Sequence, residues 1–403
     1  MSIHVEFISG GGVTSPVGFR AAGVCAGIKK QPGSLDLALL SGDVPCTATG
    51  VFTRNLFRAA PVRLCQERLK TATAQAIVVN SGCANAGTGP EGFSDAVAMA
   101  NAAARRLSLP PQAVLVASTG IIGQRLPMER IEKALNTVVV STGGGHDFAR
   151  AIMTTDTVAK EVALRVSYDG VEFVIGGAAK GSGMIHPDMA TLLCFLSTDA
   201  GVEAGLLKTA LKRAADVSFN MVSVDGDTSS NDSLFILASG GSGAAVHPGT
   251  EAAIAFQQGL ETACVHLAKL IASDGEGATR LLEVRVSGAV SVEDARQVAR
   301  AIASSALVKT ALHGADPNWG RVLAVAGRSA AAFDESRLRL ELGGMTMFAG
   351  GQPQPFDAAL ARQALSQKEV VISLDLGLGS GSAVGWGCDL SEDYVRINSE
   401  YST

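Results

Sequence analysis

Aromatic residues and long uncharged runs are scarce in this sequence, and both shortages narrow the class of protein. Phe, Trp and Tyr make up 5% of the 403 residues, so a large core must be built mainly from Ala, Val, Leu and Ile. No run of about 18 consecutive apolar residues is present, so we expect no membrane span. The first residues lack a basic segment followed by an apolar core, so we expect no secretory signal peptide.

Clustered charge and paired cysteines are also lacking. The formal net charge is -5, and the 33 Lys and Arg residues are mixed with the 38 Asp and Glu residues along the chain. Nucleic-acid surfaces and polybasic membrane patches both need clustered basic residues, so neither partner is expected. The seven cysteines are scattered and form no C-x-x-C pair. We therefore expect reduced thiols in a cytoplasmic protein with no metal or other cofactor.

Strand-like and helix-like segments alternate from one end of the chain to the other. Ala76–Asn80 and Ala113–Ala117 are short, apolar and β-prone, whereas Phe93–Leu107 and Val292–Leu307 have the composition of helices. This mixture predicts an α/β fold, or α+β sandwich, in which helices cover the sheets. A sub-domain boundary is expected near residue 280, directly before the strand candidate Leu281–Val286.

The segment between residues 171 and 199 combines two strand candidates with a flexible loop. Phe173–Ile175 is apolar and β-prone, and the glycines that follow it let the backbone turn freely. Thr191–Leu196 is again a buried-strand sequence. A threonine therefore begins an expected core strand directly after a glycine-rich loop.

Thr191 in this position has the chemistry of a nucleophile. A hydroxyl nucleophile needs a base within hydrogen-bond reach. Cleavage of the Ala190–Thr191 peptide would give Thr191 a free α-amine beside its own hydroxyl, and such an amine has a pKa of about 7.7–8.0. Before cleavage, the same hydroxyl could attack the preceding carbonyl in an N-to-O acyl shift. Many threonines begin buried strands for packing reasons alone, so the position by itself leaves both interpretations open.

The wider sequence contains motifs of a known family. Lys180–Leu193 resembles the self-cleavage motif of the ornithine acetyltransferase family, the bifunctional glutamate N-acetyltransferases of arginine biosynthesis. The resemblance spans nearly the whole chain and keeps the family's order. The further matching segments are Gly50–Asn55, Asn80–Gly89, Ser118–Gly123, Ala151–Thr157, Val224–Asp232, Ser273–Thr279, Leu307–Arg321 and Asn398–Thr403.

The resemblance implies a self-processing acetyltransferase of the N-terminal-threonine-nucleophile type. Members of this family move an acetyl group from N-acetyl-L-ornithine to L-glutamate through an acetyl-threonine, in a ping-pong cycle. Processing would divide the chain into an α chain, residues 1–190, and a β chain, residues 191–403, which assemble as an α2β2 heterotetramer. Some members also acetylate glutamate from acetyl-CoA, so acetyl-CoA is a candidate second donor.

Individual site residues follow from the same resemblance. Thr191 matches the nucleophile, and Ala190 precedes it at the scissile bond. Thr119 and Gly120 match the pair that forms the oxyanion hole. The positions that match substrate-contacting residues are Thr154, Lys180, Thr191, Glu276, Asn398 and Thr403.

Each of these positions also has a structural interpretation. Lys180 could bind a carboxylate as a point charge, or it could be a solvated loop cation. Glu276 lies between two glycines, where a tight turn would present its carboxylate to an ammonium group or simply to solvent. Asn398 and Thr403 contribute only if the C-terminus folds into the site, whereas chain ends are normally frayed. His186 is expected to be a solvent-facing loop histidine rather than a partner of Thr191, since the α-amine already supplies a base.

Two other functions remain open at this point. An aminopeptidase-like hydrolase would share the threonine nucleophile but pass its acyl group to water. An uncleaved, non-catalytic amino-acid-binding protein would use the same polar residues without any chemistry.

Overall fold

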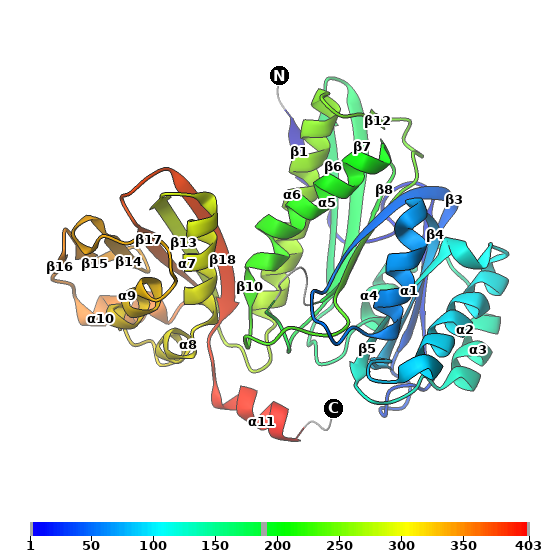
Figure 1. Ribbon diagram of the computed structural model, residues 1–403, viewed down its shortest axis with the longest axis horizontal. Helices are drawn as coiled ribbons and strands as arrows, with labels where there is room; N and C mark the ends of the chain where they lie inside the picture. The colour runs from blue at the N-terminus through cyan, green and yellow to red at the C-terminus, as the bar shows by residue number, and fades with distance from the viewer. Residues whose placement is uncertain (1–2, 187–191, 401–403) are drawn as a thin grey trace.

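The computed structural model describes residues 3–186 and 192–400, and their architecture is two β-sheets with helices packed against them (Figure 1). A 9-stranded sheet organises the larger part of the described chain and a 7-stranded sheet the smaller part. A short third sheet pairs β9 (Gly201–Val202) with β12 (Ala245–Val246). The α/β fold class predicted from the alternating segments, with helices covering the sheets, is confirmed.

The larger sheet is mixed, and its pairing brings three chain segments to one place. β7 and β8 are antiparallel, whereas β8 and β11 are parallel, so Lys180 and Ser233 both lie opposite Leu193. The strand order is β1 (His4–Phe7), β6 (Lys160–Tyr168), β7 (Val171–Lys180), β8 (Leu193–Thr198), β11 (Ser233–Ala238), β3 (Leu37–Phe52), β4 (Thr73–Cys83) and β5 (Val114–Ile121), with β2 (Phe19–Val24) also paired to β3.

Apolar side chains fill both faces of this sheet. In β8, Cys194 and Leu196 join the core on one face, while Phe195 joins the core on the other. Side chains alternate between the faces of a strand, so a strand buried on both faces is apolar throughout. The first face is covered by α5 (Ala204–Val217) and α6 (Glu251–Ser273), and the second by α1 (Ala60–Arg68), α2 (Gly89–Leu107), α3 (Met128–Thr137) and α4 (Gly145–Ala151) (Figure 1).

The smaller sheet is built mainly from the last third of the chain. Its strand order is β10 (Val222–Ser223), β18 (Gly381–Cys388), β13 (Leu281–Ala289), β17 (Glu369–Asp375), β14 (Arg339–Leu342), β15 (Met345–Ala349) and β16 (Gln352–Pro353). The helices of this part are α7 (Val292–Ser304), α8 (Ala306–His313), α9 (Trp319–Gly327) and α10 (Ala358–Leu365). After β18, α11 (Glu392–Glu400) leads the chain from the smaller part back toward the larger one, as Figure 1 shows.

One expected helix is divided in two. The sequence predicts a single helix over Val292–Leu307, but α7 ends at Ser304. Ser305 is extended, and its side chain accepts a hydrogen bond from the N–H of Val308, which caps the start of α8. Within the described ranges, no helix is both long and apolar enough to cross a bilayer.

Candidate functional site

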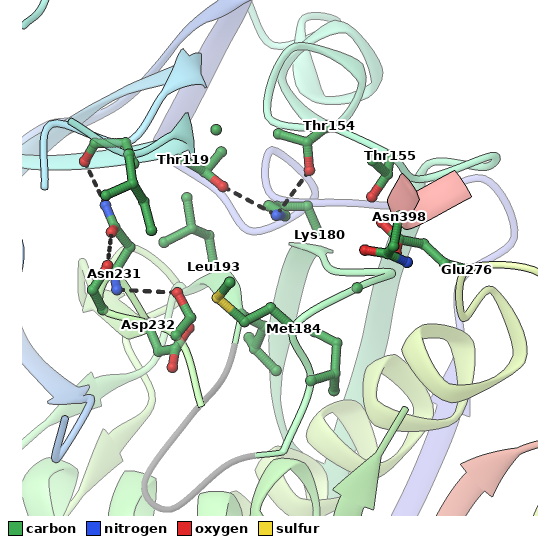
Figure 2. A pocket seen from close by; sticks show the side chains of 18 residues that line it. Thr119, Thr154, Thr155, Lys180, Met184, Leu193, Asn231, Asp232, Glu276 and Asn398 are labelled. Atoms are coloured by element: carbon green, nitrogen blue, oxygen red, sulfur yellow. Dashed lines mark hydrogen bonds between the residues drawn. The ribbon is translucent and has the colours of Figure 1, made fainter. Parts of the chain in front are cut away.

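A cavity of about 140 Å³ opens at the ends of strands in the larger sheet, where the ends of β5 and β7 and the start of β8 lie near the loop before β11 (Figure 2). Six residues singled out from the sequence line this cavity: Thr119, Gly120, Thr154, Lys180, Glu276 and Asn398. Ala190, Thr191 and Thr403 lie outside the described residues. Leu192, the residue directly after Thr191 in the sequence, also lines the cavity. Those positions of the family resemblance that the structure describes thus come together around one space.

Gly120 lies at a point where the backbone has room only for glycine. It lies one residue before the end of the parallel pairing of β5 with β4, opposite Gly82, with a φ of +125°. A Cβ atom placed there would come within 2.4 Å of the Gly82 carbonyl carbon. The missing side chain therefore lets two strand ends approach closely and leaves the backbone around Thr119 and Gly120 on the cavity wall.

Lys180 ends β7 as a buried cation in the cavity wall. Its Nζ donates hydrogen bonds to Thr119 Oγ1 at 3.1 Å and to Thr154 Oγ1 at 3.0 Å (Figure 2). Burial lowers the pKa of Lys180, and the nearby charge of Asp156 opposes that shift. Both hydrogen-bond partners are neutral hydroxyl groups, so the charge can still attract an anion in the cavity. Lys180 is therefore not a solvated loop cation.

Glu276 and Asn398 form another part of the cavity wall (Figure 2). Asn398 Nδ2 donates to Glu276 Oε2 at 2.8 Å, and the Glu276 N–H donates to the Ser182 carbonyl at 3.0 Å. Asn398 reaches this place because α11 brings the end of the chain back to the turn after α6. At Asn398 the chain is thus helical and hydrogen-bonded to the site, not a frayed tail.

A buried ionic network behind the cavity was not anticipated from the sequence. Lys160 is fully buried, and its Nζ lies 2.6 Å from Asp156 Oδ1 and 2.5 Å from Asp274 Oδ2. The pairing joins β6, the loop before it and the residue that follows α6, across 114 residues of sequence. Two carboxylates around one ammonium leave a net negative charge, which further hydrogen bonds must stabilise.

Those further hydrogen bonds run directly to the cavity residues. Asp156 accepts from the N–H of Thr154 at 3.0 Å and from the N–H of Gly181, the residue after Lys180, at 2.7 Å. Asp274, two residues before Glu276, accepts from the N–H of Thr157 at 3.0 Å. The network therefore fixes the backbone beside three of the predicted substrate-contacting residues.

The same network should make the fold sensitive to acid. Burial alone would raise the pKa of Asp156, but Lys160 and Lys180 outweigh it and hold that pKa at about 2. An unfolded Asp has a pKa of about 3.9, so the carboxylate stabilises the fold above about pH 4, and this share is lost as the pH falls toward 2. We expect the free energy of unfolding, measured in urea from pH 5 to 2.5, to lose on the order of 2 kcal/mol from this group.

The Asp156→Asn variant is the control for this acid response. It lacks the titrating carboxyl group, so its smaller stability should fall less steeply over the same pH range. An equally steep fall in the variant and in the parent protein would show that the acid response arises elsewhere.

Two side chains from the loop before β11 form hydrogen bonds with backbone groups near the cavity. Asp225 Oδ1 accepts from the N–H of Ile185 at 2.8 Å, which fixes the backbone just before residue 187. Asn231 Nδ2 donates to the carbonyl groups of Ala84 at 2.6 Å and Ser118 at 2.8 Å. The motif Val224–Asp232 matched the family, but no position within it was singled out, because its hydrogen-bond partners are far away in the sequence.

His186 differs from its expected position. It is half-buried rather than solvent-facing, and its Nδ1 lies 3.0 Å from Ser223 Oγ. Its Nε2 lies 3.3 Å from a guanidinium nitrogen of Arg300 on α7. In the part of the chain that the structure describes, no three His, Cys, Asp or Glu side chains are grouped so that they could hold a metal ion.

Comparison with known proteins decides the family. The model of the ArgJ family matches residues 20–403. The arginine biosynthesis bifunctional protein ArgJ of Dehalococcoides mccartyi is 53% identical over 405 residues, which cover 100% of both chains. This chain belongs to the ArgJ family. The ArgJ protein of Thermosynechococcus vestitus is also 53% identical, over 413 residues and 98% of each chain.

A solved structure gives a further match. The crystal structure of ornithine acetyltransferase from Mycobacterium tuberculosis, complexed with ornithine, is 47% identical, with a TM-score of 0.44. The match covers 46% of the present chain and 100% of that chain. As a member of the ArgJ family, the present chain is an acyltransferase of arginine biosynthesis. Family membership favours acetyl transfer over the aminopeptidase-like hydrolase and over a binding protein without chemistry.

Proposed function

We propose that this ArgJ-family enzyme cleaves its own Ala190–Thr191 bond and then uses Thr191 to carry an acetyl group from N-acetyl-L-ornithine to L-glutamate. The observation that carries the proposal is the cavity beside Leu192, which gathers the matched polar residues around one space. Cleavage yields an α chain of residues 1–190 and a β chain of residues 191–403. The α-amine created at Thr191 acts as the base for the hydroxyl of the same residue.

The charges of the cavity match the substrates. Lys180 binds the α-carboxylate that N-acetylornithine and glutamate share, and the Thr154 hydroxyl keeps its ammonium group in place. Glu276 binds the side-chain ammonium of the ornithine moiety. Asn398, whose amide donates to Glu276 when no substrate is bound, donates to the side-chain carboxylate of glutamate instead. Thr403 completes the substrate-contacting set.

Thr119 and Gly120 stabilise the tetrahedral intermediate. Thr191 attacks the acetyl carbonyl, and the oxygen that becomes negative accepts hydrogen bonds from the Gly120 N–H and the Thr119 hydroxyl. Lys180 already donates to Thr119 Oγ1, so the hydroxyl hydrogen must point elsewhere and is free to serve the oxyanion. Ornithine then leaves, and the glutamate amine attacks the acetyl-threonine in the second half of the cycle.

Incubation with N-acetylornithine, with and without glutamate, tests this function. Ornithine should be released in step with the formation of N-acetylglutamate, and only slowly when glutamate is absent, because the acetyl-enzyme then waits for its acceptor. Ornithine release at the same rate without glutamate would show that water is the acceptor and would establish the hydrolase instead.

The proposal extends to a second donor, to assembly and to location. The relatives named above are described as bifunctional, which supports a second activity, the acetylation of glutamate from acetyl-CoA. The processed chains form an α2β2 heterotetramer. All seven cysteines are free, which supports a cytoplasmic location. Each step uses side chains and backbone of this chain, so the proposal includes no metal or prosthetic group.

A further inference from the structure

Asp232 is a buried carboxyl group in the cavity wall that the cycle above does not use. Its exposed fraction is 2%, and it lines the same cavity as Lys180 and Glu276. Its Oδ2 atom has no hydrogen-bond partner among the described residues. A buried polar atom without a partner destabilises the fold, so its presence calls for an explanation, of which a catalytic role is one.

The backbone holds this carboxyl group firmly in position. Asp232 directly precedes β11, and its carbonyl accepts from the N–H of Thr53 at 3.0 Å. The next N–H, of Ser233, donates to the Leu192 carbonyl at 2.9 Å. Ser229 and the backbone of Leu192 also act on the carboxyl group, and both lower its pKa. It is therefore fixed beside the residue that follows Thr191 in the sequence.

One charged residue of the cavity, Asp232, has no substrate group assigned to it in the cycle proposed above. Among the described residues that line it, the acidic groups are Asp232 and Glu276 and the cation is Lys180. Ornithine carries two amino groups and one carboxylate, so its charged groups are complementary to the two carboxyl groups and one ammonium group of the cavity. Figure 2 shows Asp232 and Glu276 on opposite sides of the view, with Lys180 between them. With Glu276 on the side-chain ammonium, Asp232 is left for the α-nitrogen, the atom that exchanges the acetyl group.

We propose that Asp232 is a further catalytic residue, which protonates the departing α-nitrogen of ornithine and deprotonates the incoming α-ammonium of glutamate. This inference rests on the function proposed above. It gives the cavity an acid and a base for the substrate nitrogen, in addition to the α-amine that serves Thr191.

The protons balance over the cycle. In the first half, the bond between the acetyl carbon and the α-nitrogen breaks, and the bond to Thr191 Oγ forms. The hydroxyl proton passes to the α-amine of Thr191, and Asp232 protonates the α-nitrogen as its bond to the acetyl carbon breaks. The freed amine then takes the proton held by the α-ammonium of Thr191 and leaves as an ammonium ion. In the second half, the Asp232 carboxylate removes a proton from the glutamate ammonium. The free amine attacks the acetyl carbon, and its surplus proton returns to Thr191 Oγ.

The electrostatic surroundings suit this role. Burial raises the pKa of Asp232 well above its usual range, while hydrogen bonds from Ser229 and Leu192 and the charge of Lys180 on β7 oppose the shift. Glu276, after α6, is the other charged residue that lines the cavity. A carboxyl group with a raised pKa keeps its proton more readily, and is a stronger base once it has lost it, than an exposed one.

The Asp232→Asn variant, assayed with two acetyl donors, tests the proposal. N-acetylornithine has a leaving group that must be protonated, whereas 4-nitrophenyl acetate releases a stable anion that needs no proton. We expect kcat/KM for N-acetylornithine to fall roughly 10²–10³-fold, and kcat/KM for 4-nitrophenyl acetate to stay close to that of the parent enzyme. Asp232→Glu retains an acid at this place and should recover part of the activity with N-acetylornithine.

Asp199 offers a matched control. It has an exposed fraction of 2%, and burial raises its pKa, but its carboxyl oxygens accept from the N–H groups of Val17 at 3.0 Å and Val174 at 2.8 Å. It does not line the cavity. Asp199→Asn should therefore leave the ratio of the two donor activities unchanged.

Three results would overturn the role of Asp232. The first is an Asp232→Asn enzyme that keeps the parent rate with N-acetylornithine, and the second is an equal loss with both donors. The third is that both Asp232 variants fold but remain uncleaved, which would assign the residue to processing rather than transfer. Failure of the proposed function looks different, because the parent enzyme itself would then not exchange acetyl between ornithine and glutamate.

Discussion

The Thr191→Ala variant is expected to remain a single chain of 41.2 kDa and to lose acetyl transfer entirely. Alanine has no hydroxyl to attack the preceding carbonyl, so no α-amine is released, and no group remains to carry the acetyl. Loss of a nucleophile in related acyl-transfer mechanisms lowers kcat by roughly 10⁴-fold or more. Denaturing electrophoresis reports the processing, and the exchange assay with N-acetylornithine and glutamate reports the transfer.

Thr191→Ser is the matched control for this variant. It keeps a hydroxyl group at the same place and should be processed at least in part. Two bands from Thr191→Ala, corresponding to residues 1–190 and 191–403, would refute Thr191 as the residue that cleaves the chain.

Of the substitutions considered for their effect on stability, replacement of Lys160 by methionine is expected to lower the free energy of unfolding most. The change leaves Asp156 and Asp274 buried without the ammonium group that now lies between them. Breaking a buried ion pair by removing one partner costs about 3–5 kcal/mol, because the remaining charge has no compensation. Unfolding in urea near pH 7 measures the loss. Transfer should also slow at temperatures where the variant is folded, since Asp156 holds the backbone of Thr154 and Gly181.

Arg20 provides the comparison at the surface. It pairs with Asp43 at 2.8 Å, but the two side chains are 49% and 47% exposed. Exposed pairs contribute little to stability, so Arg20→Met should unfold at nearly the same urea concentration as the parent protein. A Lys160→Met variant as stable as Arg20→Met would show that the buried network does not hold the fold together.

The sequence reveals those residues of the site that lie within short motifs recognisable from neighbouring positions. Lys180, Thr119 and Glu276 lie in motifs that match the family, and the structure brings them to one cavity. The alternation of apolar strands and amphipathic helices predicts the fold class, since a strand such as β8 can be buried on both faces only if helices cover both. The end of α7 was missed, because a serine within an apolar helix and a serine that caps the next helix look alike in sequence.

Long-range pairing explains what the sequence does not reveal. Lys160 is separated by 114 residues from Asp274, and a lysine beside a glutamate at the start of a strand gives no sign that it is fully buried. Asn398 and Glu276 are 122 residues apart, and only the return of α11 brings them together. Asp232 belongs to a polar loop motif, and its burial in the cavity wall depends on the pairing of β11 with β8.

The mass of the chain that begins at Thr191, measured after mixing with N-acetylornithine alone, tests the central claim most directly. The account predicts that residues 191–403 gain the mass of one acetyl group, that peptide mapping places it on Thr191, and that glutamate removes it. A chain without added mass under conditions where exchange proceeds would contradict the acetyl-threonine, as would an acetyl group on another residue.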